Sequence, residues 1–181
     1  LCPRFGIEST LVDGTDIDAW KAAIRPNTKV LFFETPSNPT LDLVDIQAVS
    51  DLAHANDAIV IIDNVFATPL MQRPMLHGAD VVVYSATKHI EGQGRGLGGI
   101  VLGNADFIEK YLHPYLKHTG PSLSPFNAWV LLKGLETLPV RVRSQCDGAS
   151  RINTALRGRS GVRRVIYCGC EHHPQAEVAR R

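Results

Sequence analysis

Residues Val81–Lys88 read VVVYSATK, and this segment says most about how the chain folds. Four apolar or aromatic residues precede two hydroxyl side chains and a lysine, and a glycine-rich segment follows at residues 92–99. A continuous apolar run of this kind is typical of a strand that is covered on both faces of a parallel sheet. We therefore predict a central strand that delivers Ser85, Thr87 and Lys88 to its carboxyl end.

Two further strand-like runs also end in polar side chains. Residues 29–33 (KVLFF) lead into Glu34–Pro39 (ETPSNP), and residues 58–62 (AIVII) lead into Asp63-Asn64. Open α/β sheets bind ligands in a crevice outside the carboxyl ends of their strands. We therefore expect the segments that follow the three strands to border one site.

The order of the elements favours an α/β fold with a mostly parallel sheet flanked by helices on both faces. We expect strands near residues 5–12, 29–34, 58–63, 80–84 and 99–103. Asp16 and Asp45 are suitable N-caps for two crossover helices. Further helices are expected over residues 104–118, from Pro125 to Leu135, and from Pro139 to Leu156.

A domain boundary is expected near Leu138. We assign residues 1–138 to a large domain that is partly present, and residues 139–181 to a connecting helix and the start of a smaller α+β domain. The first strand of that domain is expected at residues 162–167. The chain starts at Leu1 without an initiator methionine or a signal peptide, so we expect it to be an interior part of a longer protein.

The composition excludes several classes of protein. The 181 residues are 44% hydrophobic and 20% charged, which is typical of a globular chain rather than a disordered one. The net charge of +1 favours a small-molecule substrate over nucleic acid. Unbroken apolar runs reach only about five residues, whereas crossing a bilayer takes ~20. We expect no membrane partner and a cytoplasmic protein, which reduced cysteines would suit.

A second cluster, formed by Cys168, Cys170, His172 and His173, has the side chains that bind zinc. Its two cysteines are separated by one residue, and zinc sites favour wider ligand spacings. We therefore expect no metal here, and we interpret the segment as a strand end that carries reduced thiols.

A lysine, a buried carboxylate and two hydroxyls are the groups that a pyridoxal phosphate site needs. Lys88 can form a Schiff base with the cofactor, Asp63 can keep its ring nitrogen protonated, and Ser85 and Thr87 can donate to its phosphate. Asp63 ends an apolar strand, where a carboxylate is costly to bury without a cationic or hydrogen-bonded partner. Each residue alone is more commonly a cap, a turn residue or a solvated side chain. Only their combination predicts the site.

Two other motifs overlap this region. Residues 85–88 satisfy the S-x-x-K pattern of serine acyl-transfer enzymes, with Ser85 as nucleophile, but the accompanying S-D-N and K-T-G strings do not occur in the sequence. Residues 94–99 satisfy G-x-G-x-x-G, yet they lead into a strand instead of opening a helix after one. We therefore favour the lysine and cofactor site over an acyl enzyme or a dinucleotide site.

Four segments occur in the order ETPSNP (34–39), IDNVFATP (62–69), SATK (85–88) and SLSPFNA (122–128). Together they resemble the cysteine and methionine metabolism family of pyridoxal-phosphate enzymes, the trans-sulfuration enzymes, which have the aspartate-aminotransferase-like fold (fold type I). The resemblance covers essentially the whole chain. It implies that Lys88 carries pyridoxal 5'-phosphate, Asp63 pairs with its pyridine nitrogen, and Ser85 and Thr87 contact its phosphate. Asn38 would lie near the phenolic oxygen of the cofactor and the substrate carboxylate.

Within the family, HIEGQGR at residues 89–95, followed by LGG at 97–99, is most similar to the O-succinylhomoserine sulfhydrylases. The resemblance implies a γ-replacement in methionine biosynthesis, in which sulfide displaces the acyl group of an O-acylhomoserine to give homocysteine. A cystathionine γ-synthase, a γ-lyase and a noncatalytic fragment remain alternatives. The resemblance also implies a homo-oligomer, expected to be a tetramer, and further site groups that precede Leu1 or follow Arg181.

Overall fold

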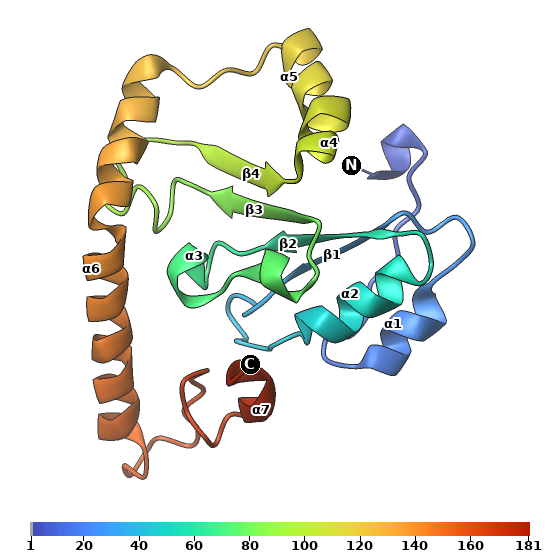
Figure 1. Ribbon diagram of the computed structural model, residues 1–181. Helices are drawn as coiled ribbons and strands as arrows, with labels where there is room; N and C mark the ends of the chain where they lie inside the picture. Colours follow the sequence, from blue (N-terminus) through green and yellow to red (C-terminus); the bar gives the residue numbers. More distant parts are fainter. Residues whose placement is uncertain (1) are drawn as a thin grey trace.

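The computed structural model describes residues 2–181, and Figure 1 shows the arrangement of its elements. The strands are β1 (Val30–Glu34), β2 (Ile59–Asp63), β3 (Val81–Ser85) and β4 (Gly99–Gly103). The α-helices are α1 (Ile17–Ala23), α2 (Ile46–His54), α3 (Thr68–Met71), α4 (Ala105–Phe107), α5 (His113–Thr119), α6 (Pro125–Leu156) and α7 (Ala176–Ala179). Short 3-10 helices η1 (Cys2–Phe5) and η2 (Pro74–His77) and a π-helical turn η3 (Ile108–Leu112) complete the chain.

The four strands form one mixed sheet in the order β1-β2-β3-β4. The pairings of β1 with β2 and of β2 with β3 are parallel, and that of β3 with β4 is antiparallel. The mostly parallel sheet and the central positions of β2 and β3 are therefore confirmed. β4 is antiparallel because the chain turns back through residues 86–98 without a crossover helix, which a parallel partner would require. The carboxyl end of β3 points toward α6 (Figure 1).

The core lies between the sheet and the helices α1 and α2, which pack together beside β1 and β2 (Figure 1). The two predicted caps are confirmed, because Asp16 accepts a hydrogen bond from the N–H of Asp18 and Asp45 accepts one from Ala48. Trp20 meets Phe33 edge to face, with ring centroids 5.7 Å apart. The core side chains of the strands are Leu31, Phe33, Val60, Ile62, Val82 and Tyr84, all less than 10% exposed.

The opposite face of β1 is open. Val30 and Phe32 alternate with the buried residues of this strand and are 46% and 59% exposed. Within residues 2–181, this part of the sheet is covered on one face only.

Two predicted strands do not form. Residues 6–12 have no regular structure, and Ile7 and Leu11 are 55% and 99% exposed. Residues 162–167, which include Arg163 and Arg164, also lack regular structure. Apolar alternation indicates only which side chains share a face, whereas a strand also needs a neighbour for its backbone N–H and C=O groups. Neither segment pairs with any of the four strands in the described part of the chain.

One continuous helix, α6, replaces the two helices that were predicted to meet near Pro139. Ser124 caps it by accepting a hydrogen bond from the N–H of Asn127 (3.1 Å). Proline removes one helical hydrogen bond, but the buried side chains of Leu138 and Val142 anchor the helix on either side of it. The predicted domain boundary falls inside α6, and the division into two domains stays a prediction.

The helical region predicted over residues 104–118 forms as α4, η3 and α5 in succession. Asn104 caps its start by accepting a hydrogen bond from the N–H of Phe107. None of the helices in residues 2–181 combines the length and the apolar character needed to cross a membrane.

Candidate active site

Lys88 lies in the turn that directly follows β3. Its N–H donates to the carbonyl of Ser85 (3.2 Å), and its own carbonyl accepts from the N–H of Gly92 (2.8 Å). The residue is exposed. The main chain of Lys88 is therefore held on both sides, while its amine is accessible at the carboxyl edge of the parallel strands.

Asp63 is the last residue of β2 and is half-buried. One carboxylate oxygen, Oδ1, accepts a hydrogen bond from the N–H of Val65 (3.0 Å). Asp63 pairs in register with Val83, and Ser85 lies two residues further along β3. Because side chains alternate along a strand, Asp63 and Ser85 share one face of the sheet. The structure thus brings these two predicted site residues to the same edge and the same face.

Thr87 closes the base of the loop between β3 and β4. Its Oγ1 accepts from the N–H of Gly98 (3.1 Å) and donates to the Gly98 carbonyl (3.3 Å). A threonine hydroxyl has a single proton to donate. A donated hydrogen bond from Thr87 to a phosphate would therefore replace the one to Gly98, and this predicted contact stays a prediction.

Asn38 follows β1 and is exposed. Its N–H donates to a carboxylate oxygen of Glu34, the last residue of that strand (3.3 Å). Since β1, β2 and β3 are parallel, Asn38 belongs to the same edge of the sheet as Asp63 and Lys88. The roles predicted for these residues stay predictions, but their common location agrees with the topology that the sequence indicated.

Sequence reasoning assigned no role to Asn64, which is fully buried. Its Nδ2 donates to Tyr84 Oη (2.8 Å) and to the Gln72 carbonyl (3.0 Å). The Gln72 side chain donates in turn to Asn64 Oδ1 and to the Thr35 carbonyl, both at 2.8 Å. Burial raises the pKa of Tyr84 more than the hydrogen bond from Asn64 lowers it. This network joins the carboxyl ends of three strands. The sequence feature that could have indicated it is the amide side chain of Asn64, which comes directly after an apolar strand.

The cysteine and histidine cluster does not converge on a common point. Cys168 Sγ and His173 Nε2 both lie near the Leu41 carbonyl, at 3.7 and 3.0 Å, while Cys170 contacts Arg157. Burial raises the pKa of the Cys168 thiol. Within the described residues, no group of three or more His, Cys, Asp or Glu side chains could hold a metal ion.

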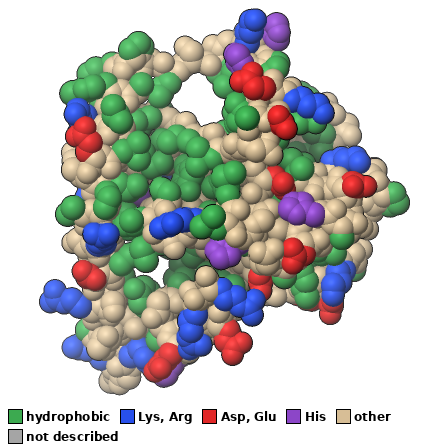
Figure 2. All heavy atoms as spheres, viewed as in Figure 1, with side chains coloured by type: hydrophobic (Ala, Val, Ile, Leu, Met, Phe, Trp, Pro, Cys, Tyr) green, Lys and Arg blue, Asp and Glu red, His purple; other side chains and the backbone are tan. Residues whose placement is uncertain are grey.

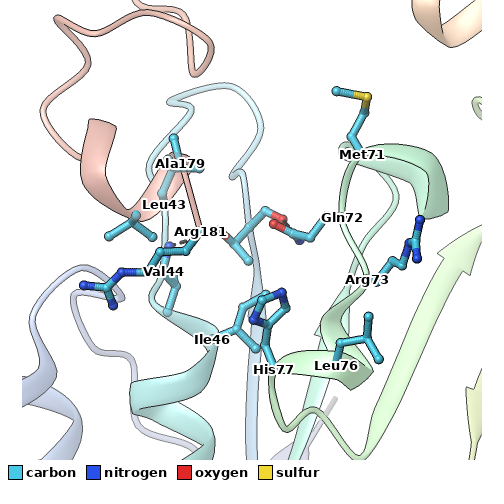
Figure 3. A pocket seen from close by; sticks show the side chains of 12 residues that line it. Leu43, Val44, Ile46, Met71, Gln72, Arg73, Leu76, His77, Ala179 and Arg181 are labelled. Atoms are coloured by element: carbon cyan, nitrogen blue, oxygen red, sulfur yellow. Dashed lines mark hydrogen bonds between the residues drawn. The ribbon is translucent and has the colours of Figure 1, made fainter.

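A cavity of about 280 Å³ lies between the C-terminal segment and the loops that follow β1 and β2. Figure 3 shows Gln72 pointing into it, with Val44 and Arg181 on the far side. None of the five predicted site residues lines this cavity. Its connection to the site is indirect, through the hydrogen bonds of Gln72 to Asn64.

The sequence profile of the family described as Cys/Met metabolism PLP-dependent enzymes matches the chain over residues 1–181. The chain belongs to this family. The family assignment made from the four sequence segments is therefore confirmed.

Several curated proteins are similar to the chain. An O-succinylhomoserine sulfhydrylase of Mycobacterium tuberculosis is 52% identical over 181 residues, which are 100% of this chain and 45% of that protein. An O-succinylhomoserine sulfhydrylase of Pseudomonas aeruginosa is 48% identical over 98% of the chain and 44% of its own length. An L-methionine gamma-lyase of Fusobacterium nucleatum is 42% identical over 98% of the chain and 46% of its own length. The chain thus spans about half the length of the curated relatives that it matches.

Solved structures confirm the fold. A cystathionine gamma-lyase from Lactobacillus plantarum, complexed with L-serine, superposes with a TM-score of 0.94 at 35% identity. The metB protein of Corynebacterium glutamicum superposes with the same score at 39% identity. Each match covers 98% of this chain, and 47% and 46% of the solved chains, respectively. The fold predicted from the sequence, that of pyridoxal-phosphate enzymes of fold type I, is therefore confirmed.

The residues at the carboxyl edge fit the cofactor of the Cys/Met metabolism family. The edge offers a half-buried carboxylate on Asp63 at the end of β2, a hydroxyl on Ser85 at the end of β3 and an accessible amine on Lys88 in the turn that follows β3. An amine suits the aldehyde of pyridoxal phosphate, a carboxylate suits its ring nitrogen, and hydroxyls suit its phosphate. The chemistry of these donors therefore matches the group that the family name implies.

Proposed function

We propose that this chain forms part of a sulfhydrylase that acts on O-succinylhomoserine in methionine biosynthesis. The observation that carries the proposal is that relatives named O-succinylhomoserine sulfhydrylase are 52% and 48% identical to this chain. O-Succinylhomoserine and hydrogen sulfide would give homocysteine and succinate. The bond between Cγ and the ester oxygen breaks, a bond between Cγ and sulfur forms, and no net oxidation occurs.

Each predicted site residue has a role in this proposal. Lys88 would hold pyridoxal phosphate, Asp63 would accept a hydrogen bond from its ring nitrogen, and Ser85 and Thr87 would bind its phosphate. Asn38 would lie near its phenolic oxygen and the substrate carboxylate. When bound, this cofactor supplies an electron sink for the bonds at Cα of an amino acid. The amine of Lys88 would then move protons at Cα and Cβ of the substrate, as a general base and acid.

The test compares Lys88→Ala with Lys117→Ala, which removes an exposed lysine of α5. Homocysteine formation from O-succinylhomoserine and sulfide should fall about 10⁴-fold in Lys88→Ala and stay unchanged in Lys117→Ala. After borohydride reduction, wild type should carry a phosphopyridoxyl group that peptide mapping places on Lys88. Turnover by Lys88→Ala near the wild-type rate would refute the proposal.

A γ-lyase or a cystathionine γ-synthase is the second candidate, favoured by the likeness to L-methionine gamma-lyase at 42% identity and to cystathionine gamma-lyase at 35%. Product analysis separates the sulfhydrylase, the synthase and the lyase. Homocysteine formed with sulfide supports the sulfhydrylase, and cystathionine formed with cysteine supports the synthase. A 2-oxo acid and ammonia formed without any added thiol would support a lyase. A folded chain that binds no pyridoxal phosphate would instead support a noncatalytic role.

We further propose a homo-oligomer, a tetramer by family resemblance, that acts in the cytoplasm. Figure 2 shows hydrophobic side chains gathered over β3, β4 and the upper part of α6. The apolar residues Phe126, Trp129 and Leu132 of α6 are 69%, 55% and 55% exposed. Exposed apolar surface of this kind supports association. Light scattering on the purified protein measures the oligomeric state.

A further inference from the structure

The loop that carries Lys88 contains a fully buried carboxylate. Glu91 is 0% exposed, and its Oε2 accepts hydrogen bonds from the N–H groups of Gln93 (2.8 Å) and Arg95 (3.0 Å). The guanidinium of Arg95 donates to its other oxygen. Burial alone would raise the pKa of Glu91, but these hydrogen bonds and the charge of Arg95 outweigh it and lower the pKa to about 2. Glu91 is therefore ionised at neutral pH and holds residues 91–95 in a tight turn.

A second contact fastens this loop to α6. Arg141 donates from Nη1 to the His89 carbonyl (2.8 Å) and from Nη2 to the carbonyls of Ile90 (3.1 Å) and Gly134 (2.8 Å). Its Nε donates to Thr137 Oγ1 (3.0 Å). The guanidinium thus bridges the helix and the two carbonyls that directly follow Lys88 in the chain.

Two glycines make the close approach of loop and helix possible. A Cβ on Gly134 would lie 2.3 Å from the Ile90 carbonyl oxygen. A Cβ on Gly92, which has a φ of +81°, would lie 2.2 Å from Arg141 Nη1. Real Cβ atoms essentially never come within 3.0 Å of a heavy atom outside their own residue and its two chain neighbours. The sequence therefore lacks a side chain at both positions where one would separate the two parts.

The hydrogen bonds of Arg141 differ from those of an arginine in a surface ion pair. Among the described residues, Arg141 forms no salt bridge, and its hydrogen bonds run to three main-chain carbonyls and one hydroxyl. Glu91, the buried acid of the loop, is already paired with Arg95. A guanidinium with several donors in a rigid plane is suited to fixing the path of a main chain. Its effect falls on residues 89 and 90, next to Lys88.

We propose that Arg141 and Glu91 are positioning residues that fix the main chain of Lys88 for the cofactor. The proposal rests on the proposed function in one respect, because it takes Lys88 as the residue that holds pyridoxal phosphate. Arg141 fixes the carbonyls after Lys88, and Glu91 shapes the turn whose Gly92 N–H binds the Lys88 carbonyl. Neither side chain acts on the substrate.

The test uses the natural chain at its full length and compares Arg141→Met with Arg143→Met, an exposed position on the same helix. In cofactor-free protein, the amides of residues 91–95 should exchange hydrogen about tenfold faster or more in Arg141→Met, because the two charge-assisted bonds from Arg141 to the loop are lost. The concentration of pyridoxal phosphate that half-saturates borohydride fixation on Lys88 should also rise about tenfold. Arg143→Met should match wild type in both measurements.

Arg141→Lys and Glu91→Gln keep the proposal testable if Arg141→Met fails to fold. Lysine keeps the charge but lacks the planar set of five donors of a guanidinium, so Arg141→Lys should show the same two changes to a smaller extent. Wild-type exchange and wild-type fixation in a folded Arg141→Lys or Glu91→Gln would overturn the proposal. A wild-type chain with no adduct on Lys88 would overturn the proposed function and the positioning role with it. Faster exchange in the variants would still show that Arg141 and Glu91 hold the loop at residues 89–95.

Discussion

Gly134→Ala should destabilise the protein even though alanine is the better helix former. The residue lies inside α6 at its contact with the loop that carries Lys88. The added Cβ would meet the Ile90 carbonyl oxygen at 2.3 Å and Glu91 Cα at 2.9 Å. Both are backbone atoms, so no side-chain rotation relieves the contact. Helix and loop would have to move apart by about 1 Å to reach ordinary van der Waals separation, which strains a close-packed contact.

The size of the effect is the balance of one stabilising and two destabilising contributions. Replacing glycine by alanine in a helix stabilises by about 0.5–1 kcal/mol, because the unfolded chain loses less freedom. Overpacking costs about 1–3 kcal/mol, and weakening the hydrogen bonds of Arg141 adds about 1 kcal/mol. A net loss of about 2 kcal/mol is expected. Gly148, in the same helix, has no atom within 4 Å of an added Cβ, so Gly148→Ala should stabilise by about 0.5–1 kcal/mol.

Urea unfolding followed by circular dichroism measures both variants against wild type. With a slope of about 2 kcal/mol per M, the midpoint should fall by about 1 M in Gly134→Ala and rise by about 0.3–0.5 M in Gly148→Ala. A Gly134→Ala midpoint equal to or above that of wild type would contradict the packing argument. A fall of equal size in both variants would show that helix propensity, rather than contact with the loop, had been misjudged.

Two further predictions concern buried polar groups near the site. Asn64→Leu removes the partners of Tyr84 Oη and of the Gln72 side chain, so stability should fall by about 2–3 kcal/mol, whereas Asn56→Leu, at an exposed position, should change it by no more than about 0.5 kcal/mol. Equal urea midpoints for the two variants would contradict this. Folding lowers the pKa of Glu91 from 4.5 to about 2, so its contribution to stability is complete above about pH 4.5 and is lost as the pH falls toward about 2. Urea midpoints should therefore fall less steeply across this range in Glu91→Gln than in wild type, and parallel curves would refute the assignment.

The strands of the sheet could be predicted from the sequence, because each of them coincides with a run of mostly apolar residues. Strands expected at 29–34, 58–63, 80–84 and 99–103 form within one residue of those limits, because apolar and β-branched runs favour strands even where, as in β1 and β4, part of a face stays exposed. The runs at 5–12 and 162–167 fail for a shared reason: a strand depends on its neighbour as much as on its own residues. The continuity of α6 through Pro139 was equally inaccessible, since it depends on what the helix packs against.

The candidate site also contains residues that the sequence could place and contacts that it could not. Lys88, Asp63 and Ser85 could be placed together because parallel strands bring their carboxyl ends to one edge. The contacts of Arg141 with His89 and Ile90 join residues that are more than 50 positions apart in the chain. Spacing along the sequence contains no signal for such a pair, and only the packing of α6 against the loop brings the two together.

The main chain around Lys88 is held by hydrogen bonds and its side-chain amine is not, and this difference supports the role proposed for the residue. Its N–H and carbonyl are both bonded, Thr87 beside it is tied to Gly98, and the next two carbonyls are bound by Arg141. Within residues 2–181, by contrast, no hydrogen bond or ion pair engages the Lys88 amine. A surface lysine with no role would need none of this support for its main chain, and a structural lysine would use its charge. A fixed main chain with a free amine is what a covalent anchor requires, since the amine must reach its partner from one defined position.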